Sequence, residues 1–226
     1  MMRPLEAELR AGALALGLEL TDLQIPLLMD YLELIQKWTK VYNLTAVRNP
    51  GEMLTHHVLD SLAVIAPLQR QLAVMRDAGA LATDASVRLL DVGSGAGLPG
   101  IVIAVCCPGV VVHCVDTVAK KAAFIQQVAV SLKLPNLRGI HARVENLTDT
   151  YDVVSSRAFA ALADFVNWSA HALAGQGVWM AMKGKHPADE LAALPTSAQV
   201  FHVEQLVVPG LGAERCIVWM RHGLPA

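Results

Sequence analysis

The chain has 226 residues, of which 54% are hydrophobic and 17% are charged, and its mean hydropathy is +0.43. This apolar content excludes a disordered or low-complexity protein, and the length suits one domain with an appendage. The formal net charge is −2, and neither residues 1–80 (7 Lys and Arg against 9 Asp and Glu) nor residues 81–226 (11 against 11) are basic. Binding of naked nucleic acid by bulk electrostatic attraction is therefore disfavoured.

The first 80 residues have the pattern of helices. Thr21 and Gln24 are spaced as a capping box, and apolar side chains follow at helical spacing as far as Trp38. We expect a loop over 42–50, then a further helix that runs through residues 53–65. Residues 79–86 have the composition of a linker. The sequence therefore predicts an N-terminal helical extension, 1–80, and a second domain, 81–226.

From residue 87 the pattern changes to short β-branched runs that alternate at first with helical segments such as 119–132. The runs cover 87–92, 110–115, 137–142, 152–155, 177–182, 200–208 and 216–220. Alternation of strands and helices predicts parallel βαβ units in a doubly wound sheet. The last connection is too short for a crossover helix, so an antiparallel hairpin is expected at the end of the sheet. This α/β pattern resembles the Rossmann-like, seven-stranded class I methyltransferase fold.

Residues 92–115 contain no Asp, Glu, Lys or Arg, which raises the question of a membrane segment. Five glycines and two prolines interrupt this stretch, and a spanning helix needs about 20 residues of unbroken helical hydrogen bonding. We therefore expect no membrane association. The N-terminus has no apolar signal-peptide core, so a cytoplasmic protein is expected. The four cysteines form no C-x-x-C pair, so we expect reduced thiols and no metal site.

The segment from Asp91 to Gly100 reads D-V-G-S-G-A-G-L-P-G and directly follows the first strand. Its glycines allow a tight turn and the close approach of a ligand to the backbone. Gly95 to Gly100 also satisfies G-x-G-x-x-G, so a nicotinamide-dependent oxidoreductase remains an alternative. Asp91 disfavours a pyrophosphate by charge repulsion. It suits a ligand with a cationic amino group, such as the methionine part of S-adenosylmethionine.

Two acidic residues are candidates for holding a nucleoside. Asp116 closes the second strand about 20 residues after the first glycines, where a carboxylate can hold ribose hydroxyls. Glu145 follows the third strand and is placed to flank an adenine edge, although a surface carboxylate in a turn is an equally good interpretation. Neither residue distinguishes S-adenosylmethionine from a nicotinamide dinucleotide as the cofactor.

The segment after the fourth strand limits the chemistry. It reads S-S-R-A-F-A at 155–160, without the Asp/Asn-Pro-Pro-aromatic segment of exocyclic-amine methyltransferases, and the chain has no Pro-Cys nucleophile. A ring nitrogen such as guanine N7 needs neither, because it has its own lone pair and no proton to lose. Catalysis is then mostly positioning. Arg157 and Lys183 lie at strand ends and are expected to act as catalytic residues by contacting O6, a phosphate or the cofactor carboxylate. The alternative for Arg157 is a structural ion pair, and the alternative for Lys183 is a position in a solvated loop.

One face of a helix carries His57, Asp60 and Ser61. At this spacing they cannot form a catalytic triad, in which a nucleophile contacts a base and the base contacts a third, orienting residue. No G-x-S-x-G elbow is present either, so a serine hydrolase is set aside. We expect this helix to pack His57 over the mouth of the pocket, where it hydrogen-bonds the glycine loop or the substrate.

Seven segments together resemble the RsmG (GidB) family of bacterial small-subunit ribosomal RNA guanine-N7 methyltransferases. They are N-L-T-A at 43–46, H-V-L-D-S at 57–61, the glycine loop at 91–100, R-V-E at 143–145, S-R-A-F at 156–159, K-G at 183–184 and G-A-E-R at 212–215. The resemblance covers nearly the whole chain in order. Cys216 departs from it, because family members often have a histidine there.

The resemblance implies S-adenosylmethionine as cofactor and a guanine of 16S rRNA as target. The low basic charge suggests a partly assembled small ribosomal subunit as the particle that is recognised, and we expect the protein to act as a monomer. By resemblance, the cofactor contacts are Gly93, Leu98, Val144, Glu145 and Arg157, beside the Asp116 inferred above. The expected pocket or RNA-side residues are Asn43, Arg48, His57, Lys183 and Arg215.

Overall fold

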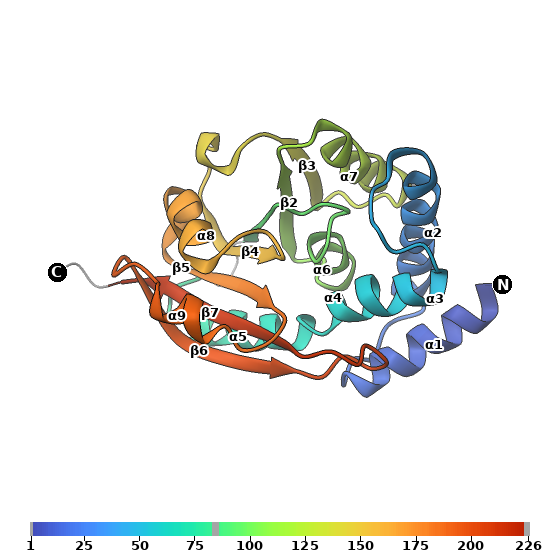
Figure 1. The fold of residues 1–226 in the computed structure, drawn as a ribbon, viewed down its shortest axis with the longest axis horizontal. Helices are drawn as coiled ribbons and strands as arrows, with labels where there is room; N and C mark the ends of the chain where they lie inside the picture. Colours follow the sequence, from blue (N-terminus) through green and yellow to red (C-terminus); the bar gives the residue numbers. More distant parts are fainter. Residues whose placement is uncertain (1, 83–85, 224–226) are drawn as a thin grey trace.

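A computed structural model describes residues 2–82 and 86–223, so part of the expected linker, residues 83–85, lies outside the described residues. Seven strands form one sheet in the order β3-β2-β1-β4-β5-β7-β6 (Figure 1). Their bounds are β1 Val87–Val92, β2 Val110–Asp116, β3 Leu137–His141, β4 Tyr151–Arg157, β5 Leu173–Lys183, β6 Ala198–Leu206 and β7 Arg215–His222.

The first five strands are parallel, and β7 is antiparallel to both of its neighbours, β5 and β6. The expected terminal hairpin is therefore confirmed. β7 enters the sheet between β5 and β6, so the last strand in the chain is not at the edge. β4 and β5 are longer than expected, because the sequence pattern of their polar and glycine-containing ends does not resemble a buried strand.

Two apolar clusters cover the two faces of the sheet. Because side chains alternate along a strand, Leu89 packs in the larger cluster with the helices of the first half, whereas Leu90 packs in the smaller cluster. Met180 and Ala181 divide between the clusters in the same way. Both faces are thus buried, which explains why consecutive residues in the middle of the central strands are apolar, such as Val153 and Val154 in β4.

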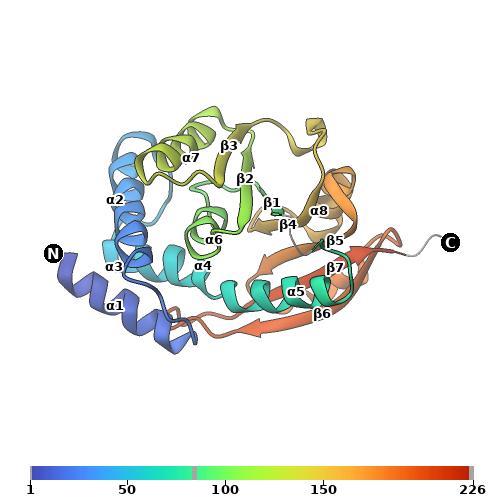
Figure 2. The same cartoon turned by 180° about the vertical axis from the view of Figure 1, so that it is seen from behind.

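The helices that follow the strands are α6 Gly100–Cys106, α7 Ala119–Ser131, α8 Leu162–Ser169 and α9 Ala188–Ala192, with two 3-10 turns, η2 Val144–Asn146 and η3 Ala170–Ala172. α6 and α7 contribute to the larger cluster and α8 to the smaller one, as in a doubly wound sheet. Figure 2 shows the opposite side of the molecule, where α4 and α5 run beside the sheet.

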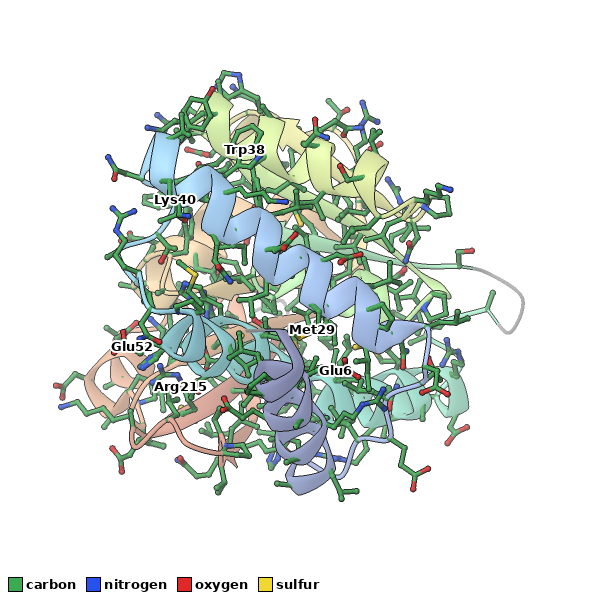
Figure 3. All side chains as sticks on the ribbon, turned by 90° about the vertical axis from the view of Figure 1, so that its right-hand side faces the viewer. Glu6, Met29, Trp38, Lys40, Glu52 and Arg215 are labelled. Carbon is green, nitrogen blue, oxygen red and sulfur yellow. The ribbon has the colours of Figure 1, made fainter. Side chains whose placement is uncertain are left out.

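The N-terminal helices are α1 Met2–Ala15 and α2 Gln24–Tyr42. The capping box is confirmed: Thr21 N donates to Gln24 Oε1 at 2.9 Å, and Gln24 N donates to Thr21 Oγ1 at 3.2 Å. Figure 3 shows α2 crossing the molecule with Trp38 at its α7 end. There the Trp38 ring lies 5.2 Å from the ring of Phe124, so α2 packs directly on the sheet-covering helices.

Residues 50–77 form an almost continuous helical stretch, so the helix expected over about 53–65 is present, but it is longer than expected and contains a π-helical segment. The segments are α3 Pro50–Met53, a π-helix η1 Leu54–Leu59, α4 Asp60–Leu62 and α5 Ile65–Asp77. A wide π turn has no simple sequence signature, and such turns occur frequently at functional sites. In the part of the chain that the structure describes, Pro50–Asp77 is also the one helix long and apolar enough to cross a membrane, but 67% of its apolar window is buried inside the protein. This burial is that of a core helix.

Candidate functional site

Three cavities meet at the carboxyl ends of the parallel strands. The strand-end cleft, about 360 Å³, lies between β1, β2 and the segment after β4, and Gly93, Asp116, Val144, Glu145 and Phe159 are among its lining residues. It contains four of the six residues expected to bind the cofactor. In open α/β sheets, ligands bind at this edge.

The glycine-loop pocket, about 190 Å³, shares Gly93 and Ala158 with the strand-end cleft. Its wall includes Leu98 and Arg157, the two remaining residues of the expected cofactor set, together with His57 and Thr45. The six residues are therefore divided between two adjoining cavities. An elongated ligand that crosses Gly93 would contact both.

The arginine pocket, about 380 Å³, continues from the glycine-loop pocket and shares His57, Arg157 and Ala158 with it. It brings together Arg157 from the end of β4, Lys183 from the end of β5 and Arg215 from the start of β7. Since β7 is antiparallel to β5, its first residue lies at the same edge as the ends of the parallel strands. The pocket thus has a cationic wall built from three strands.

Asp116 holds the glycine loop in place. Its side chain is 5% exposed, Oδ2 accepts from Gly95 N at 3.0 Å, and Oδ1 accepts from Val118 N at 2.9 Å. Lys121 Nζ lies 3.6 Å from Oδ2. The residue lines the strand-end cleft as expected, and it also fixes the loop that separates this cleft from the glycine-loop pocket.

Asp91 does not face a ligand, and the expectation that its charge holds a cationic amino group is wrong. The side chain is fully buried; Oδ2 accepts from Gly100 N at 3.1 Å, and Oδ1 accepts from Ser155 Oγ at 2.9 Å. Burial raises the pKa of Asp91 to about 7. The carboxyl group therefore connects β1 to α6 and to β4, inside the protein.

We predict that Asp91→Asn flattens the pH dependence of folding without weakening ligand binding. A carboxyl whose pKa rises from 3.8 to about 7 on folding stabilises the protein at low pH. That contribution disappears between about pH 4 and pH 7, at up to about 1.4 kcal/mol per pH unit. Asparagine keeps an acceptor for Gly100 N and stays neutral. The wild-type free energy of unfolding, measured in urea, should fall relative to that of the variant as the pH rises through this window.

The same variant tests the position of Asp91. Affinity for S-adenosylhomocysteine, measured by calorimetry, should stay within about threefold of wild type. A tenfold loss would contradict the buried position and restore a ligand-facing carboxylate.

Arg157 forms an ion pair inside the cavities that it lines. Nη1 donates to Asp60 Oδ2 at 2.8 Å and to His56 O at 2.9 Å, and the side chain remains 20% exposed. The ion pair proposed as an alternative to a ligand contact is therefore present, but the guanidinium still borders the glycine-loop and arginine pockets. Arg157 can therefore form the ion pair and contact a ligand at the same time.

Lys183 is not a solvated loop residue. Nζ donates to Glu190 Oε2 at 2.7 Å and to Ala160 O at 2.9 Å, and the side chain is 15% exposed. The ion pair with α9 and the bond to the segment after β4 hold the ammonium at the wall of the arginine pocket.

His57 lies between the glycine-loop and arginine pockets, as expected, but it hydrogen-bonds Thr45 rather than the glycine loop. Nε2 lies 2.9 Å from Thr45 Oγ1, and Nδ1 is buried without a hydrogen-bond partner among the described residues. Burial, followed by the charge of Arg157, lowers the pKa of His57 to about 4. The ring is therefore neutral near pH 7.

Asn43 and Arg48 brace a loop instead of lining any of the three cavities. Arg48 Nη2 donates to Asn43 Oδ1 at 2.7 Å, and Nη1 donates to Thr39 O at 2.8 Å at the end of α2. Asn43 has a φ of 52° and ends α2 in the left-handed conformation, which asparagine tolerates. The bracing holds the segment that carries Thr45 against His57.

Sequence reasoning missed an aromatic pair in the strand-end cleft. The rings of Phe159 and Trp168 meet edge to face with centroids 5.8 Å apart, and both residues line the cleft. Glu145 also lines it, and the Arg143 guanidinium that hydrogen-bonds its carboxylate lowers the pKa of Glu145. Phe159 belongs to the segment quoted for Arg157 and lies two residues after the end of β4, so an aromatic residue just beyond a strand end was the available signal. Within residues 2–82 and 86–223, no group of His, Cys, Asp or Glu suits a metal ion.

The chain is similar to one known protein family over most of its length. The family model described as rRNA small subunit methyltransferase G matches residues 24–218. The Ribosomal RNA small subunit methyltransferase G of Albidiferax ferrireducens is 69% identical over 220 residues, which cover 97% of this chain and 98% of the relative. These findings do not support a nicotinamide-dependent oxidoreductase.

Solved structures show the fold. TrmN from Thermus thermophilus is 17% identical with a TM-score of 0.51, over 72% of this chain and 48% of TrmN. The ribosomal protein L11 methylase from Lactobacillus delbrueckii subsp. bulgaricus is 14% identical with a TM-score of 0.50, over 71% of this chain and 79% of the methylase. With the seven-stranded order, they confirm the expected class I, Rossmann-like fold. By the match of its sequence over most of its length, the chain belongs to the rRNA small subunit methyltransferase G family.

Proposed function

We propose that this protein transfers the methyl group of S-adenosylmethionine to N7 of a guanine in 16S rRNA. The observation that carries the proposal is the junction of the three cavities. The strand-end cleft adjoins the glycine-loop pocket at Gly93 and Ala158, and the glycine-loop pocket continues into the cationic arginine pocket at Arg157 and Ala158. The relatives are named as methyltransferases of small-subunit ribosomal RNA. The cleft accounts for the cofactor and the cationic pocket for an RNA acceptor.

The residues present fit the cofactor. Gly93 has no side chain between the strand-end cleft and the glycine-loop pocket, and a Cβ there would lie 2.1 Å from Phe159 Cδ2. Asp116 and Glu145 would hold the ribose and the adenine edge, and Leu98 and Arg157 the methionine end. When bound, S-adenosylmethionine supplies a methyl group on a cationic sulfur that leaves as a neutral thioether.

The protein then acts by positioning and not by acid–base chemistry. Guanine N7 has a free lone pair, so no side chain needs to remove a proton, and the neutral His57 matches that requirement. The base becomes positively charged as its methyl bond forms, so a cation directly at N7 would oppose the reaction. We therefore assign Arg157, Lys183 and Arg215 to O6 or to phosphate oxygens of the acceptor, with N7 left open.

The division at about residue 80, the monomeric state and the cytoplasmic location belong to the same proposal. So does the acceptor particle, a small ribosomal subunit or its assembly intermediate. The net charge of −2 supports it, because proteins of such a particle would supply docking contacts that this chain lacks.

The test uses small ribosomal subunits that lack the modification. With radiolabelled S-adenosylmethionine, label should enter 16S rRNA and appear as 7-methylguanosine after nuclease digestion. Subunits that already carry the modification serve as the matched control and should take up no label. Label on protein or at another position of guanine would contradict the proposal. In calorimetry, tighter binding of NAD(H) than of S-adenosylhomocysteine would favour an oxidoreductase.

A further inference from the structure

One buried carboxylate on an N-terminal helix holds two arginines that come from the sheet. Asp60, the first residue of α4, has a side chain only 2% exposed. Oδ2 accepts from Arg157 Nη1 at 2.8 Å, and Oδ1 accepts from Arg215 Nε at 2.8 Å. The two arginines are on β4 and β7, which are separated in the sheet by β5. Figure 3 shows Arg215 on the side of the molecule where α3 carries Glu52.

The π-helix before Asp60 supplies a second contact. An α-helix would direct the Asp60 N–H at the carbonyl of His56, four residues earlier. Here the N–H donates to the carbonyls of His57 and Thr55, and His56 O accepts from Arg157 Nη1 at 2.9 Å. The wide turn and the carboxylate therefore hold the same guanidinium nitrogen from two directions.

The arrangement leaves part of each guanidinium for a ligand. Arg157 uses Nη1 for both of its bonds, and Arg215 uses Nε for Asp60 and Nη1 for Glu214 O at 2.8 Å. The Nη2 groups of both arginines have no hydrogen-bond partner among the described residues. Both side chains line the arginine pocket. A fixed guanidinium with free N–H groups matches the oxygen atoms of a phosphate or a carbonyl.

Stability alone does not explain the buried charge. Removing a carboxylate from water is costly, and apolar side chains of similar volume often replace buried ion pairs without loss of stability. The Asp60 contact gives, in addition, a defined orientation to two long side chains that are 20% and 24% exposed. Without it, each would lose little by turning into solvent.

We propose that Asp60 is a positioning residue for the methyl transfer proposed above. It fixes Arg157 and Arg215 so that their free Nη2 groups hold the acceptor nucleotide, and its charge offsets part of the positive charge of the pocket. The carboxylate thus lowers general affinity for phosphate and raises the fraction of bound RNA in the reactive position. The N-terminal helices thereby contribute to the reaction itself. This inference depends on the proposed function.

Asp60→Asn tests it. Asparagine has nearly the same volume but a single acceptor oxygen. Its NH2 group would face one of the two guanidinium groups, and no hydrogen bond could form there because both groups are donors. We expect the single-turnover rate of methyl transfer to fall at least tenfold with cofactor and subunits saturating. Affinity for the subunits should stay equal or increase, and its dependence on salt should steepen by up to about one charge. A merely structural role would weaken both rate and affinity.

A double-mutant cycle adds a second readout. Arg215→Gln alone should also slow transfer at least tenfold with unchanged affinity for S-adenosylhomocysteine. In Asp60→Asn with Arg215→Gln, the remaining oxygen serves Arg157, so the double variant should be no slower than the slower single variant. If the fold losses in rate of the two single variants multiply in the double variant, the shared role is overturned. A wild-type rate in Arg215→Gln would also overturn it. Arg215→Gln alone decides the question if Asp60→Asn does not fold.

Asp149→Asn is the matched control. Asp149 pairs with Arg88 at 3.1 Å, before β4 and away from the three cavities, and this variant should keep the wild-type rate. If wild-type protein transfers no label, the proposed function itself fails. If wild-type protein is active and Asp60→Asn retains its rate, only the positioning role is overturned.

Discussion

Replacing Gly93 with alanine is expected to weaken S-adenosylhomocysteine binding more than 100-fold, equivalent to about 2.7 kcal/mol. The added Cβ would lie 2.1 Å from Phe159 Cδ2 and 2.8 Å from Phe159 Cγ. The ring can relieve this overlap only by moving, and it lines the strand-end cleft that the cofactor needs. Calorimetry with the purified variant measures the loss.

Gly17→Ala is the matched control for this substitution. Both glycines have a positive φ, +65° for Gly93 and +72° for Gly17, so both variants incur a backbone cost of about 1–3 kcal/mol. A Cβ at Gly17, in the turn after α1, meets nothing within 4 Å. Thermal unfolding should therefore shift in both variants, while only Gly93→Ala loses ligand affinity. Binding within threefold of wild type in Gly93→Ala would exclude Gly93 from the cofactor site.

Arg157→Gln is expected to slow methyl transfer to small subunits at least 100-fold, even with cofactor and subunits saturating. The single amide NH2 group of glutamine can at most replace Nη1 in its bonds to Asp60 and His56 O, and it leaves neither a charge nor a second NH2 group for an acceptor oxygen. The measurement is the single-turnover rate of label transfer to 16S rRNA, beside calorimetry of S-adenosylhomocysteine. A wild-type rate at saturating cofactor would limit Arg157 to cofactor binding.

Arg70→Gln controls for the loss of an ion-paired arginine as such. Arg70 pairs with Glu204 and lines none of the three cavities. This variant should transfer label at the wild-type rate. A comparable loss in Arg70→Gln would show that the effect of Arg157→Gln comes from stability and not from the site.

The sequence was sufficient for the sheet, because its strands follow from local patterns. Buried parallel strands are short β-branched runs, and the short connection before β7 excludes a crossover helix, so the hairpin could be predicted. The position of β7 between β5 and β6 could not, since strand order depends on pairing between distant segments. The π-helix at Leu54–Leu59 was missed because its apolar spacing also fits an α-helix.

The site could be predicted where a residue's position along a strand decides its place. Asp116, Arg157 and Lys183 end their strands and therefore meet at one edge, as the sequence indicated. Asp91 also lies near a strand end, but its side chain is buried inside the protein. Only the structure shows that its oxygens accept hydrogen bonds from Gly100 N and Ser155 Oγ. The partners of Asp60 lie 97 and 155 residues away, a distance that no local pattern spans.

The insertion of β7 inside the sheet has a consequence for biosynthesis. Among the strands that the structure describes, β6 pairs with β7 alone, and Arg215 is the first residue of β7. Until His222 has been added to the nascent chain, β6 lacks its full pairing partner. Until β7 has left the exit tunnel, Asp60 can pair with only one of its two arginines. The earlier strands can assemble during translation, but the arginine pocket is completed only after the last strand has been made. The proposed acceptor site is therefore finished only after β7 has been made and has paired with β5 and β6.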